Sequence, residues 1–301
     1  MSVAVTIQAL VTGLATGAAY GLIALGFALV WRLTQTLALA HGDIVTGAVF
    51  VGVLAVIGTT PVALPLGAGR TIALTLMTLA AGAALSVAVY VVAVRPFRSR
   101  TSAWGHATGD VLGWVAGALA AGLLIRELLG LPFAQQAYAL PDPLGSPGTI
   151  ALGGGVSVPI RALEVLAVGL AAGVLVERIL AVTGAGAVIR AVADDAGAAA
   201  LLGVPTERVV LIAFALAGAL AGLAGLLIAP QAPIGLEDGV LLGLKGMTAA
   251  LLFRLGSLRA AIAGGLVIGA VEGVILATPS LGARWADLTV LAVLTVLAAR
   301  R

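Results

Sequence analysis

The sequence predicts an all-α bundle of transmembrane helices, and two observations carry that prediction. Of the 301 residues, 61% are hydrophobic and only 10% are charged, against roughly 25% charged residues in ordinary soluble domains. Apolar runs of about 20 residues, the length that crosses a hydrocarbon layer of roughly 30 Å, recur along the whole chain with short polar intervals between them. We therefore expect one membrane domain, residues 1–301, and no soluble catalytic domain.

The breaks between apolar runs predict about nine spans, and short or glycine-broken runs leave eight to ten crossings open. In order, the expected spans are residues 5–31, 36–58, 71–94, 108–129, 161–182, 209–229, 239–253, 260–279 and 285–299. Glycines spaced by four share one helix face and let membrane helices approach closely. Three runs have this spacing: Gly13, Gly17 and Gly21; Gly218 and Gly222; Gly265, Gly269 and Gly273.

The placement of arginines predicts the orientation. No basic residue precedes Arg32, so the first span lacks the basic region of a secretory signal and is expected to be a retained helix with its N-terminus outside. This orientation assigns eleven arginines to the cytoplasmic side and four to the outside, the asymmetry that membrane proteins show. The C-terminus is then cytoplasmic.

Two polar intervals are longer than turns. Residues 130–160, with several prolines and the run Gly153–Gly155, predict an ordered extracytoplasmic loop or small hairpin, either a passive connector or a docking surface. Residues 183–208 predict a cytoplasmic elbow: an amphipathic helix up to Leu202, a break at Gly203 and Pro205, and Thr206 as N-cap of the next span. From its residues alone, the elbow is either a solvated connector or an insert for a partner's groove.

Several motifs occur in the order of a known family. They are Arg190-Ala-Val-Ala-Asp-Asp-Ala-Gly-Ala-Ala-Ala-Leu-Leu-Gly-Val with Thr206-Glu207-Arg208-Val209, Ala40-His41-Gly42-Asp43, Lys245, Thr248-Ala249-Ala250, Leu255-Gly256-Ser257, Gly264-Gly265 and Glu272. Over nearly the entire chain, this set resembles the permeases of branched-chain amino-acid ABC transporters.

The resemblance implies an importer in a bacterial or archaeal cell membrane, built from two permeases, identical or paralogous, two ATPases and an extracytoplasmic solute-binding protein. Such importers carry mainly leucine, isoleucine and valine, while close relatives carry urea, short amides or other small carboxylates. Residues 183–208 would be the coupling loop. By the resemblance, its contacts with the ATPase would come from Arg190, Asp194, Asp195, Leu202 and Gly203.

The chain departs from the family pattern at several positions. Ala38 and Leu39 replace an Asn-Phe pair, and Phe253 and Arg254 replace a Gly-Gly pair. Family basic positions in the coupling loop fall on Gly184 and Ala187, which leaves Arg190 as the main positive charge there. These departures weaken the transfer of substrate and partner by analogy.

Polar side chains inside the spans are the candidate translocation or gating residues, because buried ionisable groups in membranes are costly. We expect His41 and Asp43 where the second span is interrupted at Gly42, near its cytoplasmic end; they either cap a broken helix or line the solute path. Lys245, the only lysine, either snorkels to an interface or pairs with Glu272. The full candidate set is His41, Gly42, Asp43, Lys245, Thr248 and Glu272.

Other function classes lack their motifs. The chain has no Gly-x-x-x-x-Gly-Lys-Ser/Thr loop, so ATP hydrolysis is expected in separate subunits, and the permease is not itself an enzyme. It has no His-Glu-x-x-His, Gly-x-Ser-x-Gly or cysteine, and we expect no metal, cofactor or nucleic acid, with lipid as the surrounding partner. The main rival is an ion-coupled secondary transporter, which predicts paired broken helices with inward acidic residues in both halves.

Overall fold

The computed structural model describes residues 3–59, 66–98, 108–133, 137–140, 142–143, 148–153, 155–253, 257–278 and 282–299. In these ranges the elements are α1 Val3–Thr34, α2 His41–Val56, α3 Ala68–Val89, η1 Tyr90–Val94, α4 Arg95–Arg98, α5 Thr108–Gly130, β1 Thr149–Gly153, β2 Val156–Pro159, α6 Ile160–Val182, α7 Gly184–Asp194, α8 Ala196–Leu201, α9 Thr206–Ile228, α10 Asp238–Phe253, α11 Leu258–Leu276 and α12 Ala283–Ala299.

The all-α membrane bundle is confirmed. Within the described ranges, each of the nine expected spans coincides with an apolar helix, and six of these are long and apolar enough to cross a membrane. The other three, α2, α10 and α12, have 16, 16 and 17 residues. At 1.5 Å per residue, a helix of 16 residues is about 24 Å long, shorter than the hydrocarbon layer.

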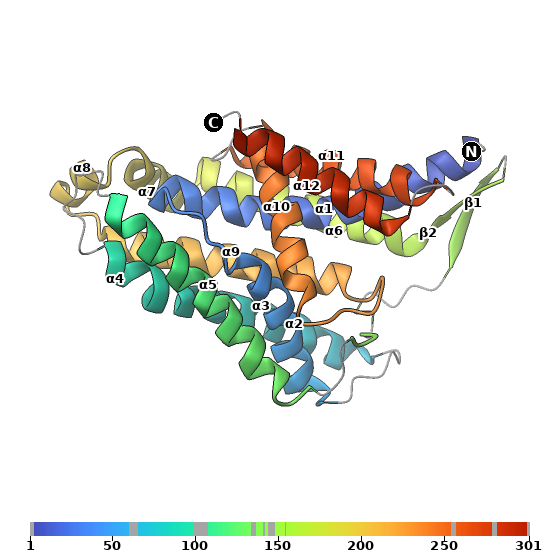
Figure 1. Cartoon of the computed structure of the whole chain (residues 1–301), viewed down its shortest axis with the longest axis horizontal. Coiled ribbons are helices and arrows are strands. Elements are labelled where there is room, and N and C mark those ends of the chain that lie inside the picture. The colour runs from blue at the N-terminus through green and yellow to red at the C-terminus, as the bar shows by residue number, and fades with distance from the viewer. Residues whose placement is uncertain are drawn as a thin grey trace.

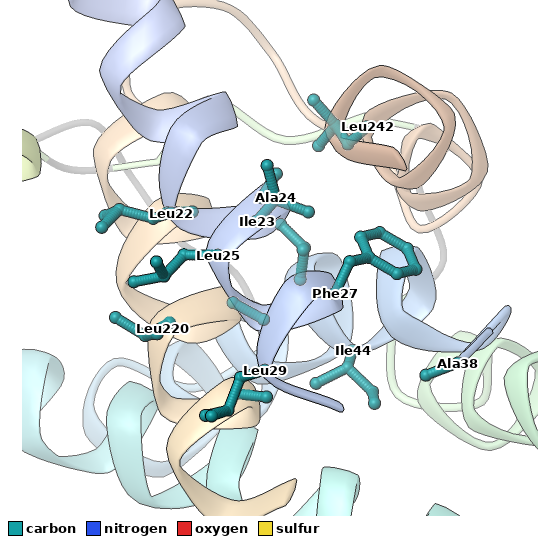
Figure 2. Close-up of a cluster of buried hydrophobic side chains, with 14 of the residues drawn as sticks. Leu22, Ile23, Ala24, Leu25, Phe27, Leu29, Ala38, Ile44, Leu220 and Leu242 are labelled. Atoms are coloured by element: carbon teal, nitrogen blue, oxygen red, sulfur yellow. The ribbon is translucent and has the colours of Figure 1, made fainter. Parts of the chain in front are cut away.

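Helix α1 forms the centre of the bundle. It packs against α11, α9, α6 and α10, and every residue from Gly17 to Val30 is buried. Figure 2 shows the core at this level: Leu22, Leu25 and Leu29 of α1 point toward α9, which carries Leu220, whereas Phe27 points to the other side, where Ile44 of α2 and Leu242 of α10 lie. Because α1 is apolar all round, its sequence fits a helix enclosed by other helices.

The long helices run along the length of the molecule, and α10 crosses them steeply (Figure 1). The N-terminus and the strands β1 and β2 lie at one end, and α7 and α8 lie at the opposite end. The α7–α8 elbow is thus separated from the hairpin by the full length of the bundle.

Two of the predicted glycine runs pack against each other. Gly13, Gly17 and Gly21 of α1 face the run on α11, and a Cβ on Gly17 would lie only 2.7 Å from the carbonyl oxygen of Gly265. Real Cβ atoms essentially never come within 3.0 Å of such a neighbour. The third run lies in α9, where Gly218 contacts the backbone of α3 in the same way. Small residues at these faces therefore permit backbone-to-backbone packing.

The described part of residues 130–160 contains a hairpin, one of the alternatives that its glycine run predicted. Strands β1 and β2 pair antiparallel, with Thr149 opposite Pro159 and a bulge between Ala151 and Gly153. Gln8 of α1 donates from Nε2 to the carbonyl oxygen of Ser157 at 2.8 Å. The hairpin is therefore tied to the first helix.

Three predicted boundaries are corrected. The second span has no helix over its first residues: Gln35 adopts φ 53°, a turn follows, and α2 begins at His41 without an interruption at Gly42. The elbow helix breaks at Asp195, whose extended backbone separates α7 from α8. Thr206 is the first helical residue of α9, and Pro205 occupies the N-cap without a side-chain cap hydrogen bond.

Candidate functional site

Two short helices begin beside each other inside the bundle. A Cβ on Gly239, at the start of α10, would lie 2.7 Å from the carbonyl oxygen of Gly42, and one on Gly243 would lie 2.8 Å from the Cα of Gly42. Gly42 therefore serves as a packing point between α2 and α10. Both helices are continuous and short, with 16 residues each, so their starts lie inside the bundle and bring polar backbone and side chains there.

His41 belongs to the packed core. Its ring meets Phe27 edge-on with 4.7 Å between centroids, and it fits over Gly26, where a Cβ would lie 2.5 Å from its Nε2. Gly26 precedes the end of α1 by eight residues, about 12 Å along the helix, so α2 starts within the bundle. This position fits the packing alternative for His41, but no side-chain hydrogen bond caps the start of α2.

Asp43 forms an ion pair that the sequence analysis did not predict. Arg126 Nη2 of α5 donates to Asp43 Oδ1 at 2.7 Å, and the two side chains are only 21% and 10% exposed. Gly122, one turn before Arg126, leaves room for the carboxylate. A signal was available, because an arginine inside an expected span calls for a buried carboxylate.

A cavity of about 320 Å³ opens beside this pair. Asp43 and Arg126 are its charged lining residues. The other lining residues come from α1, α5, α10 and the segment before α2: Phe27, Leu39, Leu119, Leu123, Val240, Gly243, Leu244 and Met247. His41 is not among them, so the structure separates His41 from Asp43.

Lys245 is buried, so the expectation that it snorkels is wrong and the pair with Glu272 is confirmed. Its Nζ lies 2.7 Å from Glu272 Oε1 of α11 and 2.9 Å from Asp287 Oδ1 of α12, and 5.6 Å from the ring centroid of Tyr20. The steep crossing of α10 points Lys245 toward three neighbouring helices. Thr248, also buried, donates to Leu244 O at 2.7 Å within its own helix.

Glu272 also reaches a second cavity. This cavity has a volume of about 600 Å³, and its polar lining includes Gln8, Thr12, Thr16 and Gln231. Oε2 of Glu272 is buried and has no hydrogen-bond partner among the described residues. Of the predicted gating residues, Asp43 and Glu272 thus line cavities, and they line different ones.

The predicted coupling residues all lie in the elbow. The guanidinium of Arg190 donates to the carbonyl oxygen of Leu180 at the end of α6, and Asp195 caps α8 by accepting from Ala198 N at 2.9 Å. Asp194 is exposed. Leu202 is 85% exposed, and its neighbour Leu201 is 92% exposed. Gly203 has φ 83°, a conformation that favours glycine.

The four departures from the family pattern lie in different surroundings. Ala38 is buried in the core, whereas Leu39 forms part of the wall beside Asp43. Phe253 is half-exposed at the end of α10. Arg254 lies outside the described residues. Among the three of these positions that the structure describes, Leu39 is the one that lines a candidate cavity.

Comparisons with known proteins agree with this architecture. A family model described as the permease component of branched-chain amino acid transport systems matches residues 9–299. The chain is 26% identical over 271 residues to the high-affinity branched-chain amino acid transport system permease protein BraD of Pseudomonas aeruginosa, covering 88% of this chain and 85% of BraD. It is 24% identical over 269 residues to the corresponding protein LivH of Escherichia coli, covering 88% and 84%.

A solved structure described as an inward-facing conformation of a metal-chelate type ABC transporter aligns with 98% of this chain and 86% of that one, at 14% identity and a TM-score of 0.49. The family match spans almost every helix of the bundle. The chain belongs to the family of permease components of branched-chain amino acid transport systems.

Proposed function

We propose that this permease is a membrane subunit of an ATP-driven importer that translocates small amino acids, chiefly leucine, isoleucine and valine. Two ATPases, a second permease and an external solute-binding protein complete the machine. The relatives' descriptions support the solute class. The observation that carries the proposal is the exposed apolar tip of the α7–α8 elbow.

The elbow has the properties of a mechanical contact. Leu201 and Leu202 project almost fully at the end of α8, and apolar side chains on a helical tip are suited to insertion into a partner's groove. The elbow is also rigid at its base, since the side chain of Thr183 caps α7 and Arg190 bonds to the end of α6. A displacement imposed on the tip is therefore passed to the transmembrane helices.

In the proposed cycle the ATPases close on ATP and move this tip, which rocks the bundle between inward-open and outward-open states. Coupling requires that the ATPase contacts differ in the two states. The membrane is a bacterial or archaeal cell membrane, with the elbow and C-terminus cytoplasmic. The N-terminus and the hairpin lie at the opposite end of the bundle (Figure 1), which in this proposed orientation faces outward, where a binding protein delivers the solute.

An ion-coupled transporter is the second candidate, and a specific observation favours it. The short helices α2 and α10 meet at their starts, and Asp43 and Glu272 are acidic groups in the two halves of the chain. The exposed elbow, however, has no role in such a mechanism. A urea, amide or small-acid importer would share the ATP-driven machinery and differ in the solute.

Co-purification tests the ATPase contact. The tagged wild-type chain is extracted gently from its native membrane. A double variant that combines Leu201→Asp and Leu202→Asp is extracted in the same way. The matched control is Leu131→Asp, because Leu131 is 83% exposed in the turn after α5 rather than in the elbow. We expect an ATPase pair with the wild type and the control, and loss of the pair with the elbow variant.

Recovery of no ATPase with the wild type, under conditions that preserve known complexes, would refute the importer assignment. Uptake of radiolabelled leucine, urea and acetamide into cells then separates the solutes. Uptake that stops on ATP depletion supports the importer, and uptake that stops only when an ionophore collapses the ion gradient supports the second candidate.

A further inference from the structure

We propose that the cavity between α2, α5 and α10 binds a small apolar zwitterion, with Asp43 receiving its ammonium group and Arg126 its carboxylate. The inference rests on the proposed function and assigns the solute site within it. The observations that carry it are the buried ion pair, the apolar walls around it and the unused hydrogen-bonding capacity of Arg126.

The two charges stand at the wall of a cavity rather than inside a close-packed interface. Both residues line the space of about 320 Å³, and their side chains remain 10% and 21% exposed. Ligand pockets begin at roughly 300 Å³, so the space suits a small solute. An ion pair that only joined two helices would have no need of a cavity beside it.

Arg126 retains donors for a carboxylate. A guanidinium has five N–H donors in a planar fork, which matches a carboxylate with two parallel hydrogen bonds. The ion pair to Asp43 uses Nη2, and Nε is buried without a hydrogen-bond partner among the described residues. A buried unsatisfied donor is costly, so Arg126 keeps hydrogen-bonding capacity that its contacts with the described residues do not use.

Charge balance favours a zwitterion over other solutes. The Asp43 and Arg126 charges cancel, so a net cation or anion in the cavity would leave one charge uncompensated in a poorly solvated place. A zwitterion places each of its charges against the opposite one. Urea and short amides carry no charges for the pair to meet.

The rest of the lining fits an aliphatic side chain. Apolar groups surround the pair from three elements, with Leu39 before α2, Leu119 and Leu123 on α5, and Leu244 and Met247 on α10. These walls favour burial of a branched hydrocarbon group. The short helices α2 and α10 begin beside the cavity and pack against each other at Gly42 and Gly239.

Direct binding tests the site. The intact transport complex is placed in nanodiscs of phosphatidylcholine, and equilibrium binding of tritiated leucine is measured without ATP or binding protein. We expect saturable binding by the wild type. Asp43→Asn and Arg126→Gln should each weaken it roughly tenfold or more, because each variant removes a hydrogen bond to a charged group.

Competition by leucine analogues assigns the two charges. Leucinamide lacks the carboxylate and 4-methyl-2-oxopentanoate lacks the ammonium group. Arg126→Gln should therefore reduce the preference for leucine over leucinamide, and Asp43→Asn should reduce the preference for leucine over the oxo acid. Equal losses for all three solutes would indicate a structural pair and overturn the inference.

A neutral double variant separates binding from folding. Replacing both partners of a buried ion pair is often neutral for stability, whereas removing one leaves a buried charge. Asp43→Asn combined with Arg126→Met should therefore purify as an intact complex with unchanged Tm but bind no leucine. Arg95→Gln is the control, since it breaks an ion pair of 2.5 Å whose side chains are 54% and 50% exposed.

The outcomes distinguish this inference from the proposed function. If the wild-type complex with its binding protein shows no ATP-driven uptake of leucine, the proposed function fails. If uptake occurs but the wild type shows no saturable leucine binding, or the double variant binds leucine as the wild type does, the assigned site alone fails.

Discussion

Alanine at Gly269 is expected to force α1 and α11 apart. A Cβ at this position would meet the carbonyl oxygen of Gly13 and the Cα and nitrogen of Gly17, all much closer than the 3.0 Å that real Cβ atoms keep. All three atoms are backbone, so no side chain can rotate away. The helices must separate by about 1 Å to reach ordinary contact.

The energetic balance follows from this separation. A gap of roughly 0.5–1 Å forfeits a quarter to a half of each dispersion contact, and overpacking of tight interfaces costs about 1–3 kcal/mol. Alanine recovers about 1 kcal/mol through its higher helix propensity than glycine. We therefore expect a net loss of up to about 2 kcal/mol in the free energy of unfolding.

The assay compares Gly269→Ala with Gly69→Ala by heating the detergent-solubilised protein and measuring the remaining monodisperse fraction. Gly69 lies in the first turn of α3, and nothing lies within 4 Å of a Cβ built there. Its replacement should leave Tm unchanged or raise it, because alanine restricts the unfolded chain. A Tm for Gly269→Ala equal to or above that of Gly69→Ala would refute the packing argument.

Two further predictions concern the buried charges and the cavity wall. Lys245→Met leaves the carboxylates of Glu272 and Asp287 without their shared cation, so it should destabilise the bundle by about 3–5 kcal/mol. Adding Glu272→Gln to this variant should restore part of the lost Tm. An unchanged Tm in the single variant would contradict the burial of Lys245. Leu39→Phe places a larger side chain in the lining of the cavity beside Asp43 and narrows the cavity. Uptake of leucine should therefore fall more than uptake of alanine. Equal effects on both solutes would contradict the assignment of Leu39 to the cavity lining.

Much of the fold could be predicted because its signals are local. The length and apolarity of each run decide whether it can span a membrane, and the apolar helices observed coincide with the expected spans. The spacing of Gly13, Gly17 and Gly21 likewise puts small residues on one face whatever the neighbour is. The cost of isolated charges in a membrane made the pair of Lys245 with Glu272 one of two alternatives, and the structure contains that pair.

The cavity beside Asp43 and Arg126 was less predictable, because it depends on which helix faces pack against each other. Asp43 and Arg126 are 83 positions apart, and no periodicity brings α2 and α5 together. Gly42 suggested a broken helix. In the structure, the chain instead leaves the helical conformation at Gln35, with φ 53°, and α2 starts only at His41. Sequence reasoning therefore grouped His41 with Asp43, although one packs in the core and the other lines a cavity.

The sequence by itself determined that this chain is a multi-span membrane protein of the transport permease family, since composition, run length and ordered motifs are properties of the linear chain. Only the tertiary structure decided the direction of the Lys245 side chain, the partner of Asp43 and the hydrogen bond from Arg190 to the carbonyl oxygen of Leu180. These depend on the crossing of α10 over its neighbours and on the docking of α7 against α6. The physical reason is that burial and pairing arise from helix packing angles, which neighbouring residues in the sequence do not encode.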